Sequence, residues 1–200
     1  GHYSSFIETY ACGRGAKYND DGADAHQTHM TNTANAPIEI IELEHPLRID
    51  KYALVQDSGG AGKFRGGLGL TREITCLVPM AASARQMRPK IKPYGLFGGK
   101  GGANDLCGVI LPNGEITQIC KEAKAGYKVI IRTSGGGGWG EPLERDINKL
   151  EWDVLNGYVS LNAAKEDYGC IIDPKNYKID IKKTNKLRKT KNILLKSKKY

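Results

Sequence analysis

The sequence predicts an α+β fold that is mainly β, with a glycine-rich, multi-stranded β body closed by a C-terminal helical hairpin. Short runs rich in Ile, Val and Thr alternate with glycine clusters, which is typical of strands joined by tight loops. Asn113-Gly114 stands between two apolar runs, and this dipeptide is the strongest short-range signal for a β-hairpin. Beyond Glu141 the apolar residues recur at helical spacing.

The first extended region is expected over residues 38–55, in two pieces. The apolar run at 38–43 indicates a strand, and a second extended piece runs to Val55. Pro46 lacks an amide donor and holds His45 in an extended conformation, so a continuous central strand is disfavoured there. We therefore interpret His45 as a bend residue and not as a ligand.

The remaining elements follow from the same signals. Strands are expected over 70–78 and 127–133, with a hairpin of 108–111 and 116–119 between them. The helical spacing between Leu143 and Tyr158 predicts one helix, which Gly157 ends. Ser160 then caps a short helix over 161–168, and Gly169 ends it.

Composition excludes several classes of protein. The cysteines are five, and they are scattered without a CxxC pair, which favours reduced thiols and a cytoplasmic location. No apolar stretch reaches the roughly 18 residues that a membrane span needs, and the first ten residues do not resemble a signal peptide. We therefore expect a protein that has no membrane association.

The net charge of +8 belongs to the C-terminus. Residues 175–200 hold eleven Lys or Arg and one acid, a balance of +10, so the other 174 residues sum to −2. We divide the chain into a body, residues 1–173, and a lysine-rich tail, residues 174–200, which we expect to be solvated and flexible. Only Tyr177 and Tyr200 interleave with the lysines, so nucleic-acid binding is disfavoured.

The glycine clusters do not form a nucleotide-binding loop. A phosphate-binding loop needs Gly five positions before its Gly-Lys pair and Ser or Thr after it. Asp57 and Phe64 stand at those positions around Gly62-Lys63, and Gly99-Lys100 fails in the same way. The clusters are better explained by tight turns and by close approach of one backbone to another.

A polar loop over residues 20–37 carries the candidate site. His26 and His29 lie three residues apart, behind Asp21 and Asp24, and all four side chains can bind a metal or move a proton. The His-x-x-His spacing lacks the i, i+4 register of helical zinc sites, so a capped turn whose histidines bond to backbone is the alternative. Arg14 lies between two glycines, in a turn that would present its guanidinium.

The roles assigned to these residues are as follows. The catalytic candidates are Arg14, Asp24, His26 and His29; the metal candidates are Asp21, His26 and His29; the substrate or structural candidates are Asn32, Thr33 and Asn35. No residue is assigned to nucleotide binding.

Four separated segments, in order, resemble the hydantoinase B/oxoprolinase family. They are GADAHQTHMTNTANAPIEIIELEHPLRI, DSGGAGKFRGGLGLTREI, YGLFGGKGG and TSGGGGWGEPLERD, within residues 6–172. The family includes the B-type components of ATP-dependent hydantoinases, one half of 5-oxoprolinase, and parts of acetone and acetophenone carboxylases. Its members are far longer, and the match is to their C-terminal part, so the chain resembles a fragment or a split subunit. Where the family commonly shows Ser-x-Arg-x-Asp-Arg, Met87 takes the place of the acid.

The resemblance implies a subunit of an ATP-dependent cyclic-amide hydrolase. An actin-like ATPase partner, the hydantoinase A-type subunit, would bind ATP and Mg and activate the amide. The B-type subunit would supply a second site, with a possible divalent metal, Zn or Mn, in the full complex. The implied partners are this ATPase and the missing N-terminal half of the B-type subunit. A subunit of a ketone carboxylase and a noncatalytic structural subunit remain alternatives.

Overall fold

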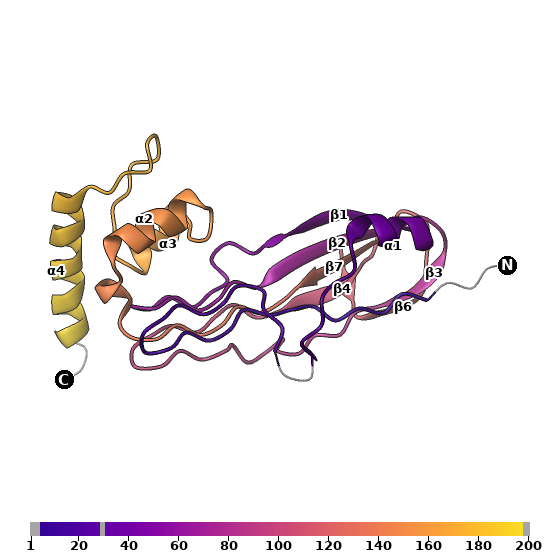
Figure 1. Cartoon of the computed structure of the whole chain (residues 1–200), viewed down its shortest axis with the longest axis horizontal. Coiled ribbons are helices and arrows are strands. Elements are labelled where there is room, and N and C mark those ends of the chain that lie inside the picture. Colours follow the sequence, from indigo (N-terminus) through magenta and orange to yellow (C-terminus); the bar gives the residue numbers. More distant parts are fainter. Residues whose placement is uncertain (1–4, 29–30, 198–200) are drawn as a thin grey trace.

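The computed structural model describes residues 5–28 and 31–197, and their strands form two antiparallel sheets (Figure 1). The larger sheet has five strands in the order β1-β2-β7-β4-β5. These are β1 (Leu47–Leu54), β2 (Leu70–Cys76), β7 (Lys128–Arg132), β4 (Leu106–Ile110) and β5 (Ile116–Thr117). The smaller sheet pairs β3 (Met80–Ser83) with β6 (Ile119–Ala123). The predicted α+β, mainly β fold is confirmed.

The predicted hairpin is formed by β4 and β5. Val109 pairs with Thr117 and Ile110 with Ile116, and the turn between the strands contains Asn113-Gly114. Gly114 has a φ of +83°, in the region that only glycine reaches without strain. The chain therefore reverses its direction at the turn that the sequence predicts.

The predicted strand over 38–43 is wrong, because Ile38–Glu44 forms a helix, α1. Only Ile41 of this segment is buried, while Leu43 is exposed, so the segment packs one helical face on the sheet. Three glutamates, which favour helix over strand, lie among the isoleucines. The predicted break is confirmed: α1 ends at His45, which is extended (φ −124°, ψ 145°) as the residue before a proline prefers.

Long extended segments that form no strands run side by side from the large sheet towards the C-terminal helices (Figure 1). Their backbones are in direct contact: a Cβ at Gly136 would lie 1.8 Å from the carbonyl oxygen of Arg14, and one at Gly67 would lie 2.0 Å from that of Ala23. Backbone hydrogen bonds join the segments, such as Gly136 N–H to Gly67 O and Gly67 N–H to Arg14 O, both 2.8 Å. Only glycine fits at such contacts, as at the axis of the collagen triple helix. The predicted close approach of backbones is confirmed.

The predicted helical hairpin follows a short 3₁₀ turn, η2 (Pro142–Glu144), and consists of α2 (Ile147–Leu155) and α3 (Leu161–Glu166). Asp146 caps α2 through Asn148 N–H at 2.7 Å, and Ser160 caps α3 through Ala163 N–H at 3.0 Å. The hairpin packs around its own small core. The core residues are Ala61, Leu150, Val154, Val159, Ala164, Tyr168, Cys170 and Ile172.

The tail differs from the solvated run that its composition favours, because Ile181–Ser197 forms a helix, α4. Thr184 is buried and its hydroxyl accepts a hydrogen bond from Ile171 N–H at 3.0 Å. Arg188 donates to the carbonyl oxygens of Tyr168 and Arg145, at 3.1 and 3.0 Å. These contacts, which residue composition does not reveal, hold α4 against the helical hairpin. The division of the chain at residue 174 stays a prediction.

Candidate functional site

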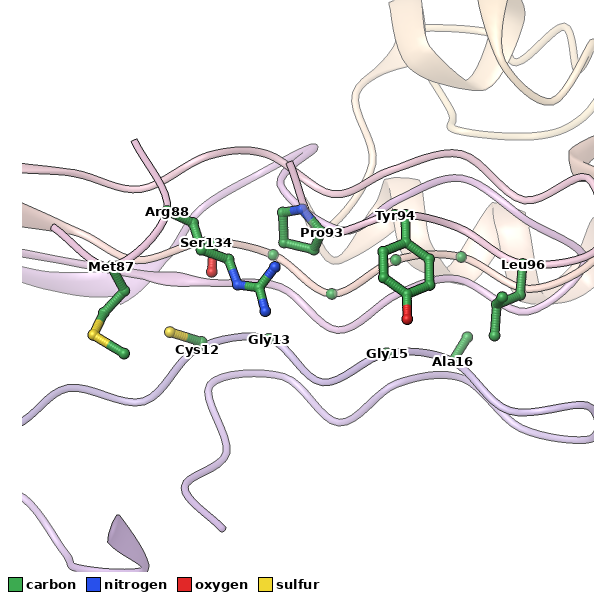
Figure 2. Close-up of a pocket in the computed structure, with 14 residues that line it drawn as sticks. Cys12, Gly13, Gly15, Ala16, Met87, Arg88, Pro93, Tyr94, Leu96 and Ser134 are labelled. Atoms are coloured by element: carbon green, nitrogen blue, oxygen red, sulfur yellow. The ribbon is translucent and has the colours of Figure 1, made fainter. Parts of the chain in front are cut away.

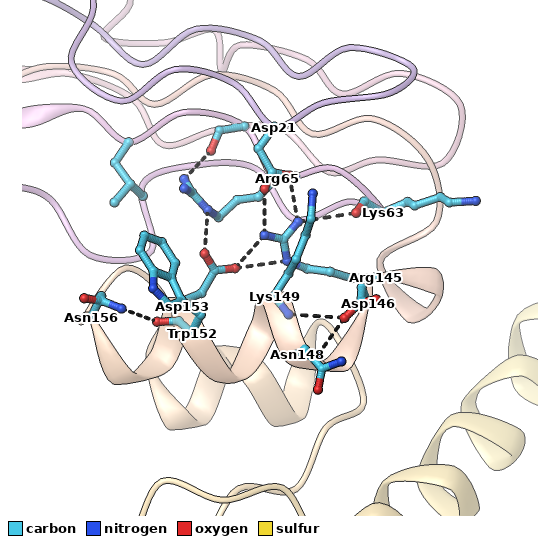
Figure 3. A network of polar contacts seen from close by, with 12 residues as sticks. Asp21, Lys63, Arg65, Arg145, Asp146, Asn148, Lys149, Trp152, Asp153 and Asn156 are labelled. Carbon is cyan, nitrogen blue, oxygen red and sulfur yellow. Dashed lines mark hydrogen bonds and ion pairs between the residues drawn. The ribbon is translucent and has the colours of Figure 1, made fainter.

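Two half-buried aspartates of the predicted site, Asp21 and Asp24, each pair with a buried arginine. Figure 3 shows Asp21 within this cluster of paired charges. Arg145 donates to both carboxylate oxygens of Asp21, at 2.8 and 2.9 Å. Arg65 donates to Asp24 at 3.0 Å, and Asp153 of α2 pairs with Arg145 at 2.7 Å and with Arg65 at 3.5 Å. The cluster joins the polar loop, the long extended segments that are rich in glycine, and α2.

The electrostatics of this cluster favour a structural role for Asp21. Burial opposes its ionisation, but hydrogen bonds from Arg145 and from the backbone amide of Arg65 outweigh this cost and hold the pKa of Asp21 below its ordinary value. Burial raises the pKa of Asp153, against the opposing effect of the two arginines. Both oxygens of Asp21 are engaged, so a metal ion there would have to displace Arg145.

The other predicted residues are more exposed. The His26 backbone N–H donates to Cys12 O at 3.1 Å, and Arg14 N–H donates to Ala23 O at 2.9 Å, so segments 12–14 and 23–26 lie side by side. The side chains of Arg14 and His26 are at least partly open to solvent. His29 lies outside the described residues. Within 5–28 and 31–197, no group of three or more His, Cys, Asp or Glu could hold a metal ion.

The second half of the polar loop is tied to the N-terminal segment. Asn35 donates to Thr9 O at 2.9 Å and accepts from the Tyr52 hydroxyl at 3.1 Å. The Thr33 hydroxyl donates to Gln27 Oε1 at 3.0 Å, whereas Asn32 is exposed. The sequence left both a substrate-binding role and a structural role open for these residues. The contacts of Asn35 and Thr33 favour the structural role.

A buried arginine of β2, Arg72, lies beside this loop and was missed by sequence reasoning. Its guanidinium pairs with Glu8 at 2.6 Å and lies over the rings of Tyr52 and Tyr10, 4.8 and 5.6 Å from their centroids. Burial, with Glu8 adding to it, raises the pKa of Tyr10. The only sequence signal for the burial of Arg72 is the alternation of side chains between the two faces of the predicted strand. This alternation does not distinguish Arg72 from the other residues of the strand.

A cavity of about 390 Å³ opens along the glycine segments (Figure 2). Cys12, Gly13, Gly15 and Ala16 form one wall and residues 134–138 another, while Arg88 and Tyr94 come from the loop between β3 and β4. Figure 2 shows the Arg88 guanidinium between Gly13 and Ser134, and the Tyr94 ring pointing towards Gly15. The lining residues are Cys12, Gly13, Gly15, Ala16, Met87, Arg88, Pro93, Tyr94, Leu96, Ser134, Gly135, Gly136, Gly137 and Gly138.

The loop that carries Arg88 is fastened by Asp105, which is buried just before β4. Its carboxylate accepts from the backbone amides of Met87 and Arg88, the latter at 2.9 Å. On the far side of the loop, Leu96 N–H donates to Gly138 O at 2.9 Å. Arg88 was visible in the sequence as the last position of the Ser-x-Arg-x-x-Arg pattern, but nothing in the pattern placed it in a cavity with residues 12–16.

A second cavity, of about 450 Å³, borders the charged cluster. Trp152, Lys149 and Asn148 of α2 line it together with Asp21 and both arginines. Four of the charges that face it, those of Asp21, Asp153, Arg65 and Arg145, are paired with one another. Lys149 lies over the Phe64 ring. Most of the charge around this cavity is therefore already paired, unlike that of Arg88.

The model of the family described as hydantoinase B/oxoprolinase matches residues 1–142. The chain belongs to this family. It is 42% identical over 189 residues to the protein MJ0963 of Methanocaldococcus jannaschii, covering 92% of this chain and 34% of that protein. It is 34% identical over 194 residues to a putative B-type component of a D-/L-hydantoinase from a Pseudomonas species, covering 94% of this chain and 33% of the relative.

A solved structure has the same fold. The ATP-dependent caprolactamase of Pseudomonas jessenii superposes with a TM-score of 0.75 at 30% identity, over 90% of this chain and 33% of that one. The chain thus spans about a third of the length of the relatives that it matches. Among the residues described here, no helix is both long and apolar enough to cross a bilayer.

Proposed function

We propose that the chain forms part of the B-type subunit of an ATP-dependent hydrolase of cyclic amides, acting with a hydantoinase A-type ATPase subunit. The observation that carries this proposal is similarity to a B-type hydantoinase component along nearly the whole chain, together with the fold of a caprolactamase. Because the chain spans about a third of these relatives, we expect the remaining part of the B-type subunit as a second partner, in a cytoplasmic hetero-oligomer.

The chemistry explains why two kinds of subunit are needed. A lactam carbonyl is a poor electrophile and its nitrogen a poor leaving group, so the ring does not open readily in water. Transfer of a phosphoryl group from ATP creates a better leaving group at the carbonyl carbon. We assign ATP and Mg to the ATPase partner, because neither Gly-Lys pair of this chain has the flanking residues of a phosphate-binding loop.

The described residues do not fit a divalent metal on this chain. Asp21 is engaged by Arg145, and His26 has no two further donors beside it among residues 5–28 and 31–197. We therefore derive no step through Zn or Mn. Asp24, His26, His29 and Arg14 stay our candidates for acid–base or positioning work, since Arg14 and His26 lie on adjoining segments.

Two experiments test this division of labour. Calorimetric titration of the lone chain with ATP and Mg should show no binding at micromolar concentration, and micromolar binding would contradict it. Co-expression with the A-type subunit and the rest of the B-type subunit should yield a complex that copurifies. ATP turnover that depends on a ketone and bicarbonate, and not on a cyclic amide, would instead support the carboxylase alternative.

A further inference from the structure

We infer that the cavity beside Arg88 binds an oxyanion, a carboxylate or a phosphoryl group, with Arg88 as its charged anchor. The site is a property of this chain alone, so it goes beyond the proposed function and does not depend on hydrolysis by the complex. The cavity wall carries a positive charge and free hydrogen-bond donors, and hydrogen bonds hold it rigid.

The charge of the wall favours an anion. Arg88 is the one Lys or Arg that lines the cavity, and no Asp or Glu lines it within the part of the chain that the structure describes. Among these same residues the Arg88 guanidinium makes no hydrogen bond or ion pair, although it lies between two wall segments (Figure 2). The planar fork of N–H groups of an arginine matches the two oxygens of a carboxylate or phosphate.

Further hydrogen-bond donors lie along the same cavity. The hydroxyls of Tyr94 and Ser134 face the cavity without a hydrogen bond to any described residue. Gly15 and Gly137 also line it, and the N–H group of neither donates a hydrogen bond within residues 5–28 and 31–197. Gly137 is buried, and buried N–H groups without an acceptor are rare in proteins. A bound oxyanion would accept from several of these donors at once.

The walls are held in place before any ligand arrives. Asp105 fastens the amides of Met87 and Arg88, and Gly102 N–H donates to Pro93 O at 2.9 Å on the other side of the loop. The glycine wall is fixed by its own hydrogen bonds, including Ala16 N–H to Gly137 O at 2.9 Å. A preformed site loses little conformational entropy on binding. A volume of about 390 Å³ also falls within the range of roughly 300–1,000 Å³ that is usual for small-molecule sites.

The test uses the isolated chain and an isosteric pair of probes. Benzoate and benzamide have the same shape but differ in charge, and inorganic phosphate is the second anion. Titration of ¹⁵N-labelled protein, followed by amide chemical shifts, gives the Kd and the residues that respond. We expect benzoate or phosphate to bind at millimolar concentration and to shift Gly15 and Gly137, whereas benzamide binds at least about tenfold more weakly, because it lacks a charge-assisted hydrogen bond.

Arg88→Gln should weaken anion binding by about tenfold or more, since a hydrogen bond to a charged group is lost. Arg85→Gln is the matched control: it removes the same charge from an exposed neighbour outside the cavity. Tyr94→Phe should weaken binding several-fold without a charge change. Equal melting temperatures for the variants would show that all of them fold.

The outcomes separate the sources of the ligand. Binding of benzoate alone indicates a carboxylate ligand, and binding of phosphate alone indicates a phosphoryl group. Equal binding of benzamide and benzoate, an equal loss in Arg85→Gln and Arg88→Gln, or no response to either anion at 50 mM, on the order of ten times the Kd expected for such small ligands, would overturn the inference. None of these results bears on whether the assembled complex hydrolyses amides, so the two proposals fail separately.

Discussion

Gly136 and Gly15 lie on neighbouring extended segments, yet only Gly136 is in close contact with another backbone. A Cβ at Gly136 would lie 1.8 Å from the carbonyl oxygen of Arg14, whereas the nearest atom to one at Gly15 is 3.9 Å away. Hydrogen-bonded backbones cannot move apart without losing their partners. Substitution at these two positions therefore distinguishes a glycine that the close packing of the extended segments requires from one that it does not require.

Gly136→Ala should lower the free energy of unfolding by about 1–3 kcal/mol or more, as overpacking does. In a chain of this size that corresponds to a fall in Tm of about 2–12 °C. Gly15→Ala should change Tm by no more than about 2 °C, because the methyl group makes only an ordinary van der Waals contact, 3.9 Å from the Gly137 carbonyl oxygen. Thermal unfolding followed by circular dichroism checks both, and equal effects would show that the segments are not closely packed.

Asp153 compensates two buried arginines, so its removal should be costly. Asp153→Asn leaves Arg145 and Arg65 with less negative charge at 2.7 and 3.5 Å. Breaking a buried ion pair on one side costs about 3–5 kcal/mol, which we expect as a fall in Tm of about 6–20 °C.

The control is Asp20→Asn, which changes an exposed carboxylate next to the same loop. We expect it to leave Tm within about 2 °C. A small effect of Asp153→Asn would mean that solvent reaches the cluster, and that Asp21 and Asp24 are freer to do chemistry than their contacts indicate.

At the scale of elements, the edge strand β1 is attached through a bulge. Its register with β2 shifts between Ile49 and Lys51, which leaves Asp50 as the extra residue. The Asp50 carboxylate accepts from Thr75 at 2.6 Å and from Arg48 at 2.7 Å, and lies 3.4 Å from Lys128 of β7. One side chain thus links three neighbouring strands.

These contacts make β1 sensitive to acid. The Thr75 hydroxyl and then Arg48 lower the pKa of Asp50 from 3.8 to about 2. The folded state therefore binds this proton less readily than the unfolded chain, so the contribution of Asp50 is complete above about pH 4 and is lost as pH falls towards 2.

Tm measured from pH 2 to pH 7 should show this directly. The difference between the native chain and Asp50→Asn should be largest at neutral pH and should disappear near pH 2. A difference that stays constant over that range would mean that the Asp50 charge does not contribute to the attachment of β1.

The elements also show how much of the fold can be predicted from the sequence. Strand β7 and the hairpin at Asn113-Gly114 were predictable because local signals, apolar runs and a turn dipeptide, decide them. The helix over 38–44 was not, because its apolar residues fit a strand as well as a helix. The packing of Ile41 on the sheet, together with the helix preference of the three glutamates, decides the outcome. Short apolar segments are decided by the surface on which they pack.

At the scale of the whole molecule, the decisive contacts span long stretches of chain. Asp21 meets Arg145 across 124 residues, and Arg88 faces a wall of residues 12–16. The residue types of the polar loop were visible in the sequence, but their partners were not, because a pairing over such a distance leaves no local pattern. The sequence thus predicts that the polar loop is a candidate site. It does not distinguish carboxylates with a structural role from carboxylates that take part in chemistry.

Arg188 tests how α4 is held at the end of the molecule. Arg188→Ala removes the donors to Tyr168 O and Arg145 O, so α4 should open more often. Hydrogen exchange of amides 185–193 should become faster while β2 and β7 keep their protection. Lys189→Ala, at an exposed neighbour, should leave exchange unchanged, and equal effects of the two variants would contradict this attachment.

The central claim is the proposal that this chain is a necessary part of the B-type subunit of a complex that consumes ATP to open cyclic amides. The most direct measurement is ATP hydrolysis by the complex of A-type subunit, remaining B-type segment and this chain, with hydantoin, 5-oxoproline and caprolactam supplied in turn. We predict that at least one cyclic amide stimulates ATP hydrolysis and is opened with it, and that omitting this chain abolishes both. Ring opening at an unchanged rate without this chain, or a complete complex that no cyclic amide stimulates, would contradict the claim.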